Sequence, residues 1–217
     1  MGKRVVSFVL SLALCATLLA GCGQEAASAS QDPELAGYER YTVTWFDVFD
    51  TVTTVIGYAA SQEEWDSQME ALHSDLVEYH QLYDIYHTYS GVTNLRDVND
   101  RAGQEPVEVD GRILGLLTEA KEMCETTGGK MNVAFGTVLK IWHNYREAAL
   151  DDPAQAAVPS LEELQAAAQH CDINDLILDE EASTVFFADP ELQLDVGSVG
   201  KGYAVEMVAR AAEERGL

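Results

Sequence analysis

The spacing of apolar residues changes several times along the chain, and each change marks a predicted element. Between residues 41 and 58 the side chains alternate and are rich in Val, Thr, Ile and aromatic rings, which predicts two strands turning around residues 49–51. A helical spacing follows, because Ser61 and Glu64 form a capping box and apolar residues recur every three or four positions as far as Tyr86. This segment therefore predicts a hairpin followed by a long helix.

The middle of the chain predicts helices separated by polar connections. Residues 87–105 are polar and numerous enough to form a functional loop. Asp110 then opens a second helix, which the glycine pair at residues 128–129 stops. An apolar segment at residues 133–142 predicts a short helix, and a further capping box begins a helix after Ser160.

Short strands and one more helix complete the pattern. Three apolar runs predict strands, at residues 176–178, 185–187 and 192–196. Residues 204–215 return to a helical spacing. Strands and helices intermix without a regular βαβ rhythm or an internal repeat, which favours one α+β domain, a mixed sheet with flanking helices.

The N-terminus is typical of an export signal. Lys3 and Arg4 precede an apolar run at residues 5–20, which is too short for a membrane-spanning helix. The run ends in Leu-Ala-Gly-Cys at residues 19–22, and this order resembles the lipobox of bacterial lipoproteins. We expect cleavage before Cys22 and lipidation of its thiol; an ordinary signal peptide followed by an incidental cysteine is the alternative.

This interpretation divides the chain into three parts. Residues 1–21 are the signal peptide, residues 22–37 are a flexible tether rich in Ala, Ser and Gln, and residues 38–217 are the globular domain. Several acyl chains on one cysteine give lasting attachment, because each buried methylene contributes about 0.8 kcal/mol. We therefore expect the domain to be anchored on the extracytoplasmic face of the cell membrane.

The charge of the chain excludes one class of partner. Lys and Arg number 13 against 37 Asp and Glu, so the formal net charge is −24. Nucleic acid is excluded as a partner because phosphate-backbone binding needs a basic surface. A small anionic ligand requires a local Lys, a metal ion or a helix N-terminus that overturns the general field.

Cysteine and histidine usage argues against a structural zinc or a redox centre. After removal of the signal and lipidation, only Cys124 and Cys171 remain in the domain, with no CxxC motif and no Cys/His cluster. Both lie among apolar neighbours on predicted helices, which favours buried free thiols over a single disulfide. The five His residues are scattered along the chain.

The glycine-rich segment at residues 195–203 has the most pronounced local pattern. Its glycines permit close approach of the backbone, the helix that follows offers free N–H groups, and Lys201 adds a positive charge. These features suit a phosphate group, although the segment matches neither a Walker A loop nor a dinucleotide-binding loop. A plain tight turn is the alternative.

Two further segments carry candidate residues. The run Gly-Gly-Lys-Met-Asn at residues 128–132 is, on local grounds, a helix stop before a buried helix. The polar stretch contains Thr88 and Tyr89, followed by Asn94 and Asn99, and its aromatic ring could stack on a planar ligand.

Together these segments resemble a known family. The order Phe-Asp-Thr at residues 49–51, Thr-Tyr at 88–89, Gly-Gly-Lys-Met-Asn at 128–132, and the segment 195–204 is similar to that of the FAD:protein FMN transferases, the ApbE family. Many members are themselves lipoproteins. The resemblance implies transfer of FMN from FAD to a Thr or Ser hydroxyl of an exported flavoprotein, with release of AMP and dependence on Mg²⁺.

The resemblance also assigns residues. The positions that contact FAD in the family fall on Phe49, Tyr89, Lys130, Met131, Asn132, Asp195 and Lys201, and Ser198 falls on a position that binds Mg²⁺ through its carbonyl oxygen. Phe49 replaces the usual Met, and Asn132 replaces the frequent Asp. On local grounds Met131 is equally a core residue, Tyr89 a surface aromatic, and Asp195 a helix N-cap.

The family continues beyond the point that corresponds to Leu217, and its later half supplies an Asp and a Thr to the Mg²⁺ site. We therefore expect an incomplete transferase domain, apparently truncated at the C-terminus, with weak or absent activity for these 217 residues alone. A lipoprotein that binds FAD without transferring it is the alternative. A solute-binding lipoprotein is disfavoured because the chain shows no duplicated lobes.

Overall fold

The computed structural model of the protein describes residues 35–217, so the predicted signal peptide, Cys22 and most of the predicted tether lie outside the described residues. The described residues divide into two compact units, one of residues 35–42 with 56–65 and one of residues 43–55 with 66–217. Strands β1 (Glu39–Trp45) and β2 (Thr53–Ala59) form a two-stranded sheet, and helix α2 (Gln62–Tyr83) follows. All three elements pass from one unit into the other.

The described part of the first unit is organised around Trp65. Its indole is 4% exposed and stacks on the ring of Tyr41, with centroids 5.5 Å apart. A Cβ atom on Gly57 would lie 2.9 Å from this indole, so only glycine leaves room for the ring at that position. Ser61 Oγ accepts a hydrogen bond from the N–H of Glu64, which confirms the predicted cap of α2.

The second unit contains the remaining elements. In chain order they are α3 (Leu95–Asp100), β3 (Val107–Glu108), α4 (Gly111–Thr126), α5 (Gly136–Asp151), α6 (Leu161–Ala167), β4 (Leu176–Asp179), β5 (Thr184–Phe187) and α7 (Gly200–Glu214), with short 3₁₀ turns at Pro153–Gln155, Ala168–His170 and Ile173–Asp175. The three short strands form an antiparallel sheet in the order β3–β5–β4. Val185 of β5 lies opposite Val107 on one side and Leu178 on the other.

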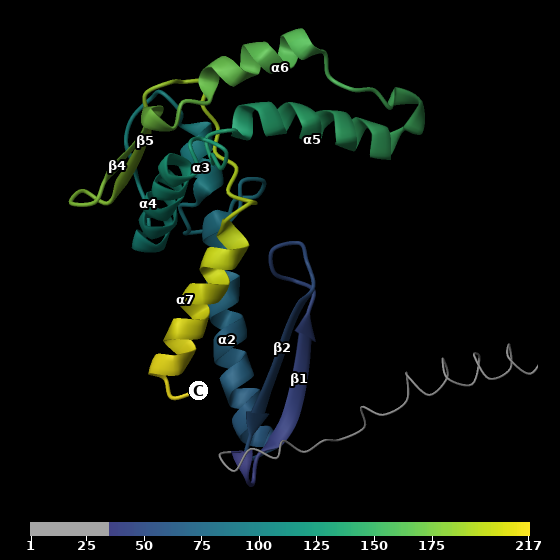
Figure 1. The fold of residues 1–217 in the computed structure, drawn as a ribbon, viewed down its shortest axis with the longest axis vertical. Coiled ribbons are helices and arrows are strands. Elements are labelled where there is room, and N and C mark those ends of the chain that lie inside the picture. The colour runs from purple at the N-terminus through teal and green to yellow at the C-terminus, as the bar shows by residue number, and fades with distance from the viewer. Residues whose placement is uncertain (1–34) are drawn as a thin grey trace, which may run out of the picture. The chain divides into compact units, whose positions relative to one another are not determined.

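Helix α4 lies against this small sheet (Figure 1). The fully buried side chains of Leu176, Val185 and Phe187 join Ile113 and Leu117 of α4 in the main core. Helix α7 runs alongside α2 (Figure 1), and a smaller cluster of Val48, Leu76 and Val208 is buried there. The burial of apolar surface in these clusters, worth roughly 25 cal/mol per Å², holds the elements together.

The mixture of helices and antiparallel strands confirms the predicted α+β class. The helix opened by Asp110 is α4, and the carboxylate of Asp110 accepts the N–H of Arg112 as the predicted cap. Strands β4 and β5 match the predicted runs at 176–178 and 185–187. Cys124 is a buried free thiol and Cys171 a half-buried one, so no disulfide forms between them.

Four predicted elements were wrong in extent or type, and the last of them is the strand predicted at residues 192–196. The stretch at residues 87–105 contains α3, whose N-terminal end is fixed by Asn94 and Asp97: each side chain accepts the other's backbone N–H, at 3.2 and 3.0 Å. Helix α5 extends to Asp151, well past the predicted residue 142. Helix α2 ends at Tyr83 because residues 84–87 turn around the carboxylate of Asp84.

The run at residues 192–196 is not a strand, because a side chain binds its backbone instead of a ladder partner. Asn99 Oδ1 accepts the N–H of Leu194 at 2.8 Å, and Asn99 Nδ2 donates to the Leu194 carbonyl at 3.1 Å. One parallel bridge joins Gln193 to Phe135. A Cβ atom on Gly136 would lie 2.4 Å from the Gln193 carbonyl oxygen, so glycine permits this close approach.

No helix among residues 35–217 is long and apolar enough to cross a membrane.

Replacing Asn99 by Ala should lower the free energy of unfolding by about 2–4 kcal/mol, because both backbone groups of the buried Leu194 would lose their partner. Urea unfolding followed by circular dichroism measures the change. Asn144→Ala is the matched control, since Asn144 is exposed, and it should change the free energy by less than about 0.5 kcal/mol. Equal effects of the two substitutions would contradict the stabilising role of the two Asn99–Leu194 hydrogen bonds.

Candidate functional site

A cavity of about 560 Å³ lies in the second unit. Its walls come from the loop between β1 and β2, the end of α2, residues 84–87, helix α5, and residues 195–201. Ligand sites of small molecules commonly occupy about 300–1,000 Å³. The cavity is therefore large enough for a substantial part of a nucleotide cofactor.

Residues 195–201 form the wall with the clearest anion-binding character. The N–H groups of Val199 and Gly200 donate to the Val196 carbonyl at 3.0 and 2.7 Å, and α7 begins at Gly200. No side chain caps this helix, and among the described residues the N–H groups of Lys201 and Gly202 have no backbone acceptor. These free donors and the exposed Lys201 side chain suit a phosphate group.

Asp195 has a different local role from the N-cap that the sequence left open. The N-cap of α7 is Val199, whereas Asp195 Oδ1 accepts the N–H of Gly197 at 2.8 Å. The N–H of Asp195 donates to the Val133 carbonyl at 2.9 Å. Asp195 thus closes a tight turn at the cavity wall and lines the cavity together with Lys201.

Phe49 lies on the opposite loop in an unusual backbone conformation. Phe49 and Asp50 have φ angles of 56° and 49°, in the left-handed region that non-glycine residues rarely adopt. The Phe49 N–H donates to His80 Nδ1 at 3.1 Å, and the two rings meet edge to face with centroids 5.6 Å apart. Buried Val48 anchors the loop beside them.

The carboxylate of Asp84 connects the cavity wall to Tyr89. Asp84 is 9% exposed and accepts hydrogen bonds from the N–H of Tyr86 at 2.6 Å and from the Tyr89 hydroxyl at 2.7 Å. Burial alone would raise the pKa of Asp84, but the hydrogen bonds from Tyr89, Tyr86 and His87 hold this pKa below its usual range. Burial and the Asp84 carboxylate raise the pKa of Tyr89 to about 12.

Tyr89 does not line the cavity, but two of its partners do. Its hydroxyl lies 3.3 Å from His80 Nε2 and 2.7 Å from Asp84 Oδ2, and both residues face the cavity. Tyr89 therefore lies behind the cavity wall, and its hydroxyl contacts two residues of that wall, His80 and Asp84.

The segment 130–132 does not line the cavity. Lys130 is exposed, and Met131 is half-buried against the main core, as its local pattern suggested. Asn132 donates through Nδ2 to the Cys171 carbonyl at 2.8 Å and accepts the N–H of Ala134 at 2.9 Å. The next residue in the chain, Val133, is the one that holds the backbone of Asp195.

Ser198 is exposed on the turn before α7, and its carbonyl accepts no backbone hydrogen bond from the described residues. That free oxygen fits the predicted role of a metal ligand. Within residues 35–217, no three His, Cys, Asp or Glu side chains converge to hold a metal ion. The Ser198 carbonyl is therefore a candidate ligand, without a cluster of three such side chains among the described residues to complete a site.

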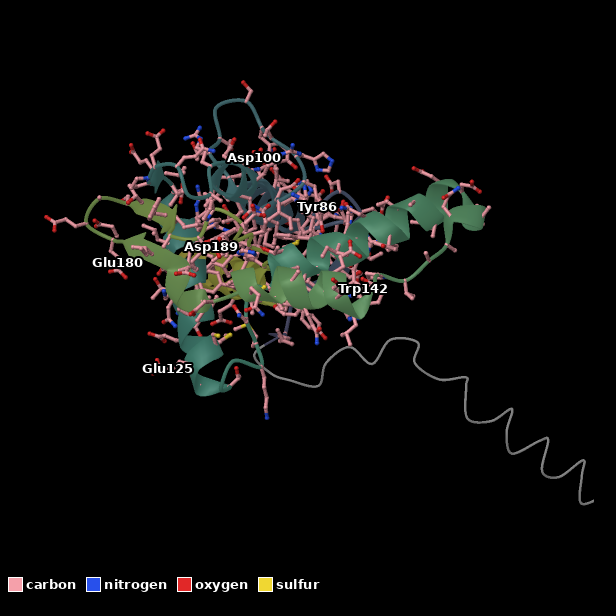
Figure 2. All side chains as sticks on the ribbon, turned by 90° about the horizontal axis from the view of Figure 1, so that it is seen from above. Tyr86, Asp100, Glu125, Trp142, Glu180 and Asp189 are labelled. Atoms are coloured by element: carbon pink, nitrogen blue, oxygen red, sulfur yellow. The ribbon has the colours of Figure 1, made fainter. Side chains whose placement is uncertain are left out.

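Sequence reasoning missed several residues of the cavity. Tyr86 lies beside α5 (Figure 2), and its ring stacks on His143 with centroids 5.0 Å apart and an interplanar angle of 27°. Arg146 and His80 also face the cavity. Each is a single polar residue or aromatic on a helix or turn, so its local sequence carries no signal that tertiary packing brings it to this wall.

A second cavity of about 260 Å³ shares Tyr86, His143 and Asp195 with the first. Arg96 and Lys140 line its other side. Arg96 donates to the Tyr86 carbonyl and lies 3.4 Å from Asp100. Four Lys and Arg side chains therefore face the two cavities, together with the carboxylates of Asp50, Asp84, Asp100, Glu147 and Asp195.

Comparison with known proteins places this site in a family. The sequence profile of the ApbE family matches residues 47–217. This chain belongs to the ApbE family. The matched range contains every cavity-lining residue of the candidate site, from the Phe49 loop to the start of α7.

Relatives with curated names share parts of the chain. The FAD:protein FMN transferase of Treponema pallidum is 32% identical over 121 residues, which are 54% of this chain and 32% of that protein. The FAD:protein FMN transferase of Haemophilus influenzae is 25% identical over 214 residues, covering 98% of this chain and 56% of the relative. The chain spans about a third to just over a half of the length of the curated relatives it matches.

Solved structures of ApbE proteins share the fold. The ApbE protein of Thermotoga maritima superposes with a TM-score of 0.65 at 23% identity, covering 80% of this chain and 52% of that one. The flavin transferase ApbE of Vibrio cholerae gives a TM-score of 0.66 at 21% identity, covering 82% and 55%. The α+β arrangement described above is thus an ApbE fold.

The pKa of Tyr89 should lie near 12, because burial and the neighbouring Asp84 carboxylate both disfavour the phenolate. Since the folded-state pKa is raised, this contribution to stability is complete below about pH 10 and is lost as the pH rises through about 12. The difference in phenolate absorbance between wild type and Tyr89→Phe measures the titration. A midpoint near pH 10 would contradict the hydrogen bond.

Proposed function

We propose that this ApbE-family protein transfers the FMN half of FAD to a Thr or Ser hydroxyl of an exported protein and releases AMP. The observation that carries the proposal is the cavity in which the open N-terminus of α7, Lys201 and Asp195 face the Phe49 loop. The names of the relatives, FAD:protein FMN transferases, support this choice of reaction.

The reaction is a phosphoryl transfer. The hydroxyl oxygen of the acceptor forms a bond to the phosphorus of the FMN half, and the bond from that phosphorus to the AMP oxygen breaks. AMP leaves with the electron pair, and the proton of the hydroxyl is lost to a base. Positioning and neutralisation of charge supply most of the catalysis in such reactions.

The described residues provide part of that neutralisation. Lys201 and the free N–H groups of the first turn of α7 suit the pyrophosphate of FAD, since an anion gains from both the charge and the helix dipole. Phe49 and Tyr86 offer aromatic surface for a flat ring at the same cavity. Met131 and the neighbouring Lys130 and Asn132 remain predicted FAD contacts.

We propose that the reaction depends on Mg²⁺. A hard cation prefers oxygen ligands and commonly binds through few protein groups together with phosphate oxygens and water. The free carbonyl of Ser198 fits this role as one ligand. When bound, the ion would neutralise charge on the pyrophosphate.

Lys201→Gln should weaken FAD binding roughly 10- to 100-fold, because a charge-assisted contact to phosphate contributes about 1.5–3 kcal/mol. Quenching of flavin fluorescence on titration with the purified protein measures the affinity. Arg101→Gln removes the same charge from an exposed position outside the cavities and should change the affinity less than about twofold. Equal losses in both variants would place the phosphate elsewhere.

The same preparation separates transfer from binding. With Mg²⁺ and an acceptor peptide carrying Thr, transfer gives AMP and a peptide heavier by FMN, and chelation of the metal should abolish both products. FAD binding with neither product would favour the alternatives to transfer, which are an FAD-binding lipoprotein or the weak activity expected of these 217 residues alone.

We further propose that the protein acts on the extracytoplasmic face of the membrane, anchored through Cys22. In its bacterial host, the mature protein should begin at a diacylglyceryl-modified Cys22 and partition with membranes, and Cys22→Ser should remain unlipidated. Mass spectrometry of the N-terminal peptide and membrane fractionation give the answer. A mature N-terminus at any other residue would rule out the anchor.

A further inference from the structure

Four residues at the back of the cavity form a chain of hydrogen bonds that runs in one direction. The Phe49 N–H lies 3.1 Å from His80 Nδ1, His80 Nε2 lies 3.3 Å from the Tyr89 hydroxyl, and that hydroxyl lies 2.7 Å from Asp84 Oδ2. These contacts link the loop between the first two strands to the residues that follow α2.

The proton positions follow from the two ends of the chain. A backbone N–H only donates, so His80 Nδ1 must be an acceptor without a proton. The neutral imidazole then carries its proton on Nε2 and donates it to the Tyr89 oxygen. The Tyr89 hydroxyl in turn donates to the Asp84 carboxylate, which only accepts.

Asp84 is fixed in this orientation by its other partners. Its Oδ1 accepts the N–H groups of Tyr86 and His87, at 2.6 and 3.1 Å, and its Oδ2 also contacts His87 Nδ1 at 3.0 Å. The side chain of Asp84 is 5% exposed, so water does not replace these donors. The oxygen that faces Tyr89 therefore cannot exchange places with the other one.

We infer that Asp84 and His80 are positioning residues: Asp84 sets the hydroxyl of Tyr89, Tyr89 sets the tautomer of His80, and His80 holds the Phe49 loop at the cavity. The Phe49 loop needs such a support because Phe49 and Asp50 both occupy the left-handed region. The effect of Asp84 and His80 on FAD binding rests on the proposed function, whereas the direction of the hydrogen bonds does not.

Asp84→Asn tests the direction of these hydrogen bonds because it replaces the acceptor that faces Tyr89 by a donor. The two backbone N–H groups require the amide oxygen at the Oδ1 position, so the NH₂ group faces the Tyr89 oxygen. The Tyr89 hydroxyl then has His80 Nε2 as its remaining acceptor, which requires the proton on Nδ1. Two donors, the Nδ1 proton and the Phe49 N–H, would then face each other, and the hydrogen bond from Phe49 to His80 would be lost.

Nitrogen-15 NMR of the histidine rings in the ligand-free, full-length chain reads this change directly. We expect His80 as the Nε2–H tautomer in the wild type and a shift toward Nδ1–H in Asp84→Asn, together with a displaced amide signal of Phe49. In Tyr89→Phe the hydroxyl is absent, so adding Asp84→Asn should leave the tautomer of His80 unchanged. A His80 tautomer that ignores Asp84→Asn, or that responds equally without the Tyr89 hydroxyl, would overturn the inference.

Substitution of His80 supplies a second readout. His80→Asn keeps an oxygen acceptor near the position of Nδ1, whereas His80→Phe keeps a ring of similar shape and loses both hydrogen bonds. The Phe variant should bind FAD roughly tenfold more weakly, and the Asn variant should retain affinity within about threefold. Equal affinities in these two variants would refute the positioning role. Absence of FAD binding in the wild type would refute the proposed function alone, and the NMR result would still decide the inference.

Discussion

The hydrogen-bond pair between the Asn99 side chain and the backbone of Leu194 is the interaction on which the site depends. It joins α3 to a segment that is distant in sequence and fixes the depth at which residues 192–196 enter the core. Leu192 and Leu194 are buried on either side of Gln193, so the segment alternates as a strand does while a side chain supplies its hydrogen bonds. Asp195 and the start of α7 follow within a few residues, so the Asn99–Leu194 hydrogen bonds also determine their position at the cavity.

A second constraint acts from the other side of the cavity. Helix α2 ends at Tyr83, and the buried carboxylate of Asp84 then gathers the N–H groups of the next turn. Burying a carboxylate costs free energy unless several donors compensate, and here two backbone groups and two side chains do so. The turn that results brings Tyr86 to one cavity wall and Tyr89 behind another. The cavity therefore lies between two segments whose backbones are fixed by buried polar side chains.

The elements that could be predicted from the sequence are those stabilised by residues close to them in the chain. Caps at Ser61, Asp110 and Ser160 each lie within three residues of the N–H they accept, so their helices were predicted correctly. Helix α3 was missed because its six residues contain too few apolar positions to show a period. It is stabilised by the paired capping of Asn94 and Asp97 and by burial of Leu95 and Val98 in the main core. The strand predicted at residues 192–196 was wrong for the complementary reason. Its alternation is real, but its partner is the amide of Asn99, about 95 residues away.

The candidate site divides in the same way. Lys201 and Asp195 could be identified from sequence because the glycines around them imply a turn before a helix, and that turn is local. His80, Asp84, Tyr86 and His143 could not, because nothing in their own neighbourhoods distinguishes them from surface residues of any helix or turn. They become functional candidates only through the contacts that α2, α5 and the Phe49 loop make with one another. In an acidic chain with a net charge of −24, those contacts also decide where an anion is accepted, because screening limits each charge to roughly 8–10 Å. The first cavity is lined by Arg146 and Lys201 and also by four carboxylates, so a donor such as Lys201 acts only on groups close to it.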